Sequence, residues 1–141
     1  MSDSYDLERF VAAQDAGGTY DRAVAELRRG YKTSHWMWFV FPQIAGLGRS
    51  GTARRYAISS LDEAKAYLDH PVLGPRLREC ASLVAQIQGR SAMQIFGDPD
   101  DMKLRSSMTL FLRAAPDEPI FQQVLDHLFD GKADSATDER L

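Results

Sequence analysis

The sequence has little of several features that would place it in a specialised class of protein. Its 141 residues contain one cysteine, Cys80, which excludes an internal disulfide framework and suits a reducing compartment. The longest unbroken apolar run covers 36–41, far short of the ~20 residues that a membrane-spanning helix needs. The first residues, MSDSYDLERF, are acidic and polar, where a secretory signal is basic and then apolar. We therefore expect a soluble, cytoplasmic protein with no membrane partner.

Acidic residues are missing from one stretch of the chain. Residues 27–61 contain six basic residues and no aspartate or glutamate, although the whole chain has a net charge of −3. Such a stretch indicates a surface that faces anions. The alternative is that these cations pair across the fold with the acidic residues near the two ends of the chain. Because the pI is about 5.6, we do not expect nucleic acid as a partner.

The rest of the sequence predicts an all-α fold, a compact bundle of about seven helices. No segment shows the sustained period-two alternation of a half-buried strand bounded by turns. We expect one helical domain over residues 1–131 and a variable tail over 132–141, with the last residues frayed. The clearest helical stripe repeats at intervals of three and four residues. It consists of Leu73, Leu77, Cys80, Val84 and Ile87.

Capping and stop signals mark the expected helix ends. Thr19 is predicted to cap a helix that stops at Gly30. Ser60 and Glu63 have the spacing of a capping box, in which each side chain satisfies the other residue's backbone amide. Asp98-Pro99 and Asp117-Glu118-Pro119 place an acidic cap and a first-turn proline ahead of two further helices.

The most site-like feature is the segment KTSHWMWFVFPQ, from Lys32 to Gln43. Its aromatic rings could stack on a base or a nicotinamide while the lysine meets a phosphate. Alternatively, the aromatic rings form the core and the indole groups bind the backbone. The apolar centre fits either a strand or a short helix, and we favour a helix because no other strand is available for pairing.

A glycine-rich loop follows this segment. Residues 46–51, GLGRSG, match the G-x-G-x-x-G pattern of dinucleotide-binding folds. That interpretation needs a strand immediately before the loop and a βαβ unit around it, and the chain predicts neither. Two possibilities stay open: a loop that cradles a phosphate beside Arg54 and Arg55, or a flexible connector.

Other candidate chemistry is sparse. Lys103, Ser106 and Ser107 share one face of a predicted helix, which could line a pocket or be simply solvated. Cys80 is expected to be a packed thiol because it belongs to the best apolar stripe. The three histidines show no metal-ligand spacing, so we assign neither a metal nor a cofactor. No catalytic motif is recognisable, and whether the protein is an enzyme is left open.

Long strings of the sequence resemble one known family, the domain-of-unknown-function 1810 family. The resemblance covers about 7–129 and rests on DLERFVAAQD, KTSHWMWFVFPQIAGLGRS, RRYAISSLDEAKAYLDHPVLGPRLREC and FGDPDDMKLRSSMTLF. It implies a compact helical domain and a mostly bacterial, cytoplasmic distribution, and no established activity. The label calpastatin, which some members carry, does not fit this sequence, because such an inhibitor would be disordered and repetitive. The chain departs from the family pattern only mildly, for example at Val40, where isoleucine is usual.

These observations lead to two hypotheses of function. The first is a site for a small phosphate-bearing ligand, nucleotide-like and related to NAD or ADP-ribose. The alternative is a protein-interaction module that uses an aromatic and basic surface. The residues predicted to bind the ligand are Lys32, Ser34, His35, Trp36, Trp38, Gln43, Gly48, Arg54, Lys103 and Ser106.

Overall fold

The computed structural model describes residues 4–141, which form helices and no strand, so the all-α prediction is confirmed. The elements are α1 (Glu8–Asp15), η1 (Ala16–Gly18), α2 (Thr19–Arg29), α3 (Met37–Val40), α4 (Gly51–Arg55), α5 (Leu61–Asp69), α6 (Leu73–Gln86), α7 (Ala92–Phe96), α8 (Asp100–Ala114), α9 (Pro119–Phe129) and α10 (Ser135–Asp138). Several of these, such as α3 and α10, are single turns that the apolar periodicity did not resolve.

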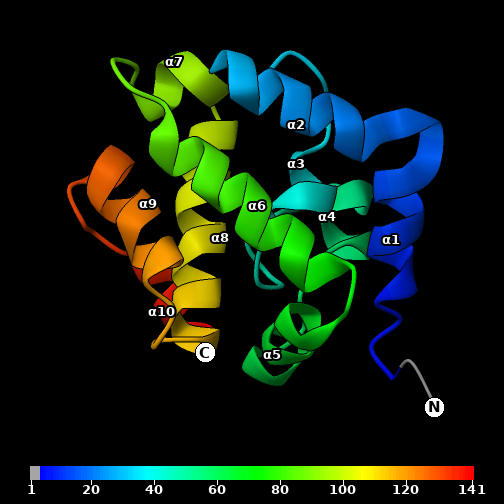
Figure 1. Cartoon of the computed structure of the whole chain (residues 1–141). Coiled ribbons are helices and arrows are strands. Elements are labelled where there is room, and N and C mark those ends of the chain that lie inside the picture. Colours follow the sequence, from blue (N-terminus) through cyan, green and yellow to red (C-terminus); the bar gives the residue numbers. More distant parts are fainter. Residues whose placement is uncertain (1–3) are drawn as a thin grey trace.

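The two longest helices, α6 and α8, have two packing partners in common (Figure 1). α5 and α9 each pack against both of them, α2 packs on α6, and α1 packs on α2 and α3. Leu73, Leu77, Cys80 and Val84 of the predicted stripe are buried in α6, whereas Ile87 lies just beyond the helix and is partly exposed. Leu104 and Phe111 of α8 are also fully buried. No helix in the described part of the chain is long and apolar enough to cross a bilayer.

The helix boundaries follow some of the predicted signals and contradict others. Gly30 ends α2 in the left-handed conformation with φ 75°, and Pro119 is the first residue of α9, both as predicted. Thr19 is not a cap, because it already belongs to α2 and its hydroxyl donates to a carbonyl of the preceding turn. Asp98 also caps nothing, since Pro99 occupies the cap position of α8 and no side chain accepts a bond there.

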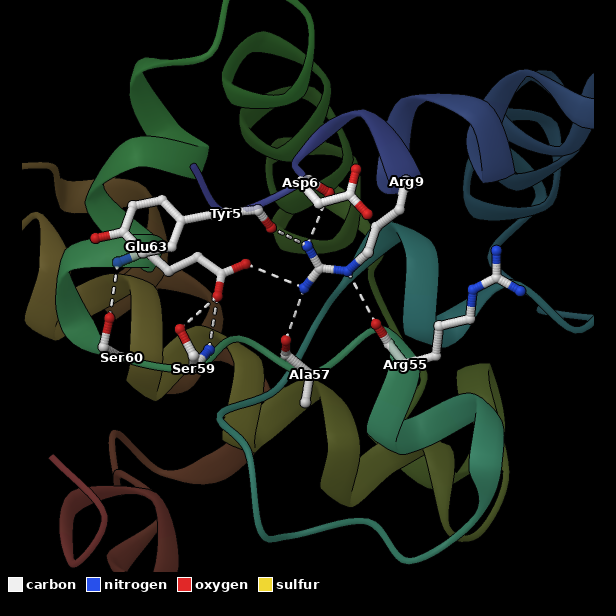
Figure 2. A network of polar contacts seen from close by, with 8 residues as sticks. All are labelled: Tyr5, Asp6, Arg9, Arg55, Ala57, Ser59, Ser60 and Glu63. Carbon is white, nitrogen blue, oxygen red and sulfur yellow. Dashed lines mark hydrogen bonds and ion pairs between the residues drawn. The ribbon is translucent and has the colours of Figure 1, made fainter. Parts of the chain in front are cut away.

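Arg9 of α1 holds together two loops that are distant in sequence (Figure 2). All five of its guanidinium N–H groups are used: four go to backbone carbonyls, of Tyr5, Asp6, Arg55 and Ala57, and one goes to the carboxylate of Glu63 at 3.1 Å. The predicted capping box is therefore only half formed. Ser60 accepts from the backbone N–H of Glu63, but the Glu63 carboxylate binds Ser59 and Arg9.

The C-terminal residues are packed on α8, and the expectation of a frayed end is wrong. Asp134 caps α10 by accepting the backbone N–H and the hydroxyl of Thr137. The same carboxylate accepts the hydroxyl of Ser106 at 2.9 Å, and Arg113 binds Asp138 at 2.8 Å. These bonds are made by polar residues, so apolar periodicity gave no sign of them.

The aromatic run at 36–41 contains a one-turn helix, α3, which confirms the choice of helix over strand. The chain then makes one isolated parallel bridge, between Ile44 and Ile58, and this bridge does not extend into a strand. Trp36 and Phe41 are both at most 1% exposed and contact each other and Phe96. At least half of the aromatic segment is therefore core.

A buried carboxylate fixes the start of this segment. Glu26 of α2 is 3% exposed and accepts four hydrogen bonds of 2.6–2.9 Å. The donors are the backbone N–H groups of Thr33 and Ser34, the Ser34 hydroxyl and the indole N–H of Trp36. Burial by itself raises the pKa of Glu26, but these bonds outweigh it and lower the pKa from 4.5 to about 2.

We predict that Glu26→Gln destabilises the fold by about 2–3 kcal/mol, because an amide NH2 would face donors that need an acceptor.

We also predict that the free energy of unfolding of the wild type decreases as the pH is lowered. The folded pKa of about 2 lies below the unfolded value of 4.5, so the unfolded state takes up the proton first. Ionised Glu26 therefore contributes roughly 3 kcal/mol to the free energy of unfolding above pH 4.5, and this contribution is lost as the pH falls toward 2.

Urea unfolding at several pH values measures both effects. The control is Glu139→Gln, because Glu139 is exposed at the end of α10 and its side chain makes no hydrogen bond within residues 4–141. A Glu26→Gln variant as stable as the control would show that the four bonds do not hold the segment.

Candidate functional site

The structure divides the predicted site residues into groups. Ser34 and Trp36 give their side-chain donors to Glu26, and Trp36 is fully buried, so both belong to the framework. Ser106 binds Asp134 and lies toward α10. Arg54 is exposed and lines a different hollow, next to Arg9. His35 is exposed in the loop before α3.

The remaining residues include two lysines that share one carboxylate. The Nζ atom of Lys32 lies 2.7 Å from one oxygen of Asp100, and the Nζ atom of Lys103 lies 3.4 Å from the other. Lys32 is nearly enclosed, with 6% of its side chain exposed, whereas 23% of the Lys103 side chain is exposed. These two lysines and one aspartate together carry a charge of +1, and Lys103 is the lysine that a ligand could reach from solvent.

Each lysine also lies over a tryptophan ring. Lys32 Nζ is 5.1 Å from the ring centroid of Trp36, and Lys103 Nζ is 4.7 Å from that of Trp38. Both distances are within the range of a cation–π interaction. The two pairs have different surroundings, because Trp36 is buried while Trp38 is only partly covered. The Trp38–Lys103 pair is therefore the half of the arrangement that a ligand could reach.

A small cavity lies beside this pair. Trp38, Gln43, Gly48 and Lys103 line it together with Tyr56 and several apolar residues. Its volume is about 10 Å³, which is room for about one water molecule. Four of the predicted residues therefore meet at one place, but the cavity itself does not accommodate a nucleotide. We call Lys32, Trp38, Gln43, Gly48, Asp100 and Lys103 the lysine–tryptophan site.

Two polar side-chain groups at this site have no intramolecular partner. Neither the Gln43 amide nor the Trp38 indole N–H makes a hydrogen bond within residues 4–141. One helical turn beyond Lys103, the hydroxyl of Ser107 is fully buried and also lacks a partner. The Gln43 amide and the Trp38 indole N–H are not among the buried unpaired atoms, so a ligand that reaches them would replace water.

The glycine loop beside the site has a packing function. A Cβ atom on Gly48 would lie 2.5 Å from the Cβ of Ala53, so only glycine lets the loop lie against α4. Gly46 has φ 98°, a conformation that favours glycine. No strand precedes this loop in the described residues, which agrees with the rejection of a dinucleotide-binding fold.

The sequence did not indicate that Asp100 belongs to the site. Asp100 lies in the first turn of α8, where an acid favours the helix N-terminus, and it also connects Lys32 to Lys103. The Asp100–Lys103 spacing of three residues was the available signal.

Cys80 is packed as expected. Burial raises the pKa of its thiol to about 12, whereas a nucleophilic cysteine needs a lowered pKa. Within residues 4–141, no three His, Cys, Asp or Glu side chains cluster to hold a metal.

The fold and this site define an all-helical protein with a small lysine–tryptophan site on α3 and α8. The chain belongs to a protein family of unknown function, DUF1810, whose model matches residues 4–141. The resemblance seen in the sequence is thereby confirmed. The chain is similar to the conserved hypothetical protein Rv1873 from Mycobacterium tuberculosis, whose crystal structure it matches with 55% identity and a TM-score of 0.95. The match covers 99% of this chain and 98% of that one, and no curated protein sequence shows significant similarity.

We predict that Asp100→Asn lowers the free energy of unfolding by about 1–3 kcal/mol, because Lys32 would lose its carboxylate while nearly buried. Lys103→Met should cost less than about 1 kcal/mol, since Lys103 is more exposed and its ion pair is longer. Urea unfolding measures both, with Asp117→Asn, at an exposed position, as the control. Equal stability of Asp100→Asn and the control would mean that Asp100 does not hold the two lysines together.

Proposed function

We propose that this protein binds a small phosphate-bearing ligand at the lysine–tryptophan site, with a nucleotide related to NAD or ADP-ribose as the first candidate. The observation that carries the proposal is the partly exposed Lys103 ammonium lying 4.7 Å from the ring of Trp38, beside the unpartnered amide of Gln43. A cation, a ring and a free amide are the groups that a phosphate and a base would use.

The small cavity restricts how such a ligand could bind. With room for about one water molecule, the cavity holds neither a phosphate nor a base. In this proposal the phosphate binds Lys103 from the solvent side and draws the ammonium away from Trp38. One face of the indole would then be uncovered for a base or a nicotinamide ring. Asp100 holds Lys103 in place before the ligand arrives, through the 3.4 Å ion pair.

The burial of the aromatic residues favours this proposal over an interaction module built on the same segment. Trp36 and Phe41 are at most 1% exposed, and Trp38 is partly covered and lines a cavity with room for about one water molecule. A docking surface needs a contiguous apolar patch on the outside of the molecule. The large apolar side chains that are exposed in the described residues lie outside 32–43.

We expect at least one phosphorylated compound in a thermal-shift panel to raise the melting temperature by several degrees. A panel of ADP-ribose, NAD, ADP and inorganic pyrophosphate covers the parts of the proposed ligand. At a hundred times its dissociation constant, a binder adds ~2.7 kcal/mol of stability, which corresponds to several degrees for a chain of this size.

Lys103→Met should remove this shift, whereas Lys65→Met, at an exposed position on α5, should keep it. Both variants lose one positive charge, so the comparison separates the site from general charge. If no compound shifts the wild type, or if both variants respond as the wild type does, the site does not bind phosphate.

A further inference from the structure

A second surface lies at the ends of α2 and α6, and none of its lining residues belongs to the lysine–tryptophan site. An open groove of about 430 Å³ is lined by Arg28, Arg29 and Arg90, with Gln86 and Gln88 beside them. A neighbouring hollow of about 420 Å³ shares Arg90 and adds Tyr31 and Gln94. No carboxylate lines either hollow. We call the two together the arginine groove.

The three arginines of this groove form no ion pair within residues 4–141. Arg90 donates one N–H to the carbonyl of Gly30 at 3.2 Å, which fixes it between the two hollows. Arg28 and Arg29 lie in the last turn of α2, where a positive charge complements the helix dipole. That role uses only their charge and leaves their N–H groups free to bind carboxylates.

Apolar and amide groups accompany the arginines. Leu27 and Ile87 contribute apolar surface to the groove. Tyr31 is 53% exposed, more than any other large apolar residue of the described chain. The backbone bond from Lys32 N to Ile95 O, 2.8 Å long, fixes the chain at Tyr31 against α7. Glutamine amides complete a surface that can bind a peptide backbone.

We propose that the arginine groove binds an acidic peptide segment of a partner protein, with apolar residues placed between its carboxylates. The arginines would pair with the carboxylates, the apolar surface would take the side chains between them, and the glutamines would bond the backbone. The groove departs from the rest of this acidic protein, whose net charge is −3. The groove contains one exposed ring, that of Tyr31, where single-stranded nucleic acid needs successive stacking platforms.

Fluorescence anisotropy with a labelled peptide tests this proposal on the full chain. The probe is a fluorescein-labelled peptide of repeated Glu-Glu-Leu, compared with a Gln-Gln-Leu peptide and an oligothymidine of similar length. We expect the acidic peptide alone to bind. The double variant Arg28→Glu/Arg29→Glu should weaken its binding by about tenfold or more, because two attractions become repulsions.

The matched control is Arg54→Glu/Arg55→Glu, which makes the same charge change at two neighbouring exposed residues of α4. It should change peptide binding by less than about twofold. Gln86→Glu adds one carboxylate to the groove wall and serves if the first double variant does not fold; it should also weaken binding.

Three results would overturn the proposal: no binding of the acidic peptide at millimolar concentration, equal losses in both double variants, or tighter binding of oligothymidine with the same dependence on Arg28 and Arg29. The last result would assign the groove to nucleic acid.

Discussion

The buried carboxylate of Glu26 is the constraint on which the site depends. It accepts two backbone N–H groups, a hydroxyl and an indole N–H from Thr33, Ser34 and Trp36, while its own backbone belongs to α2. A carboxylate so fully bonded stays ionised in the core, which explains the low pKa of about 2. Through these bonds the position of α2 determines where Trp36 lies, and with it the start of α3.

This constraint gives the aromatic segment two different roles. Trp36 is fixed on the inner side, where Lys32 covers it and pairs with Asp100. Trp38, two residues on, lies partly open beneath Lys103, which reaches the same Asp100 from α8. The site is thus assembled from two segments about 65 residues apart, and one acid on α8 sets the positions of both lysines. The buried pair, Lys32 and Trp36, thereby orients the accessible pair, Lys103 and Trp38.

The sequence predicted those features that depend on neighbours along the chain. The left-handed stop at Gly30, the first-turn Pro119 and the buried stripe of α6 follow from local backbone sterics and from helical periodicity. It failed where a polar side chain can choose between a local and a distant partner of similar energy. Glu63 binds Arg9 and Ser59 rather than completing a capping box, while Ser91 and Gln94 form one that was not predicted. The sequence placed the lysine and the two tryptophans in one segment, but Asp100, which connects that lysine to α8, became evident only in three dimensions.

Hydrogen exchange of the two indole N–H groups, followed by two-dimensional NMR, tests the division of this segment most directly. The indole N–H of Trp36 is buried and donates to Glu26, whereas that of Trp38 has no partner within residues 4–141. The account predicts that the Trp36 signal disappears in D2O only at the rate of global unfolding and that the Trp38 signal disappears much earlier. Loss of both signals at the same early rate would contradict it, because Glu26 would then not hold Trp36 in the framework.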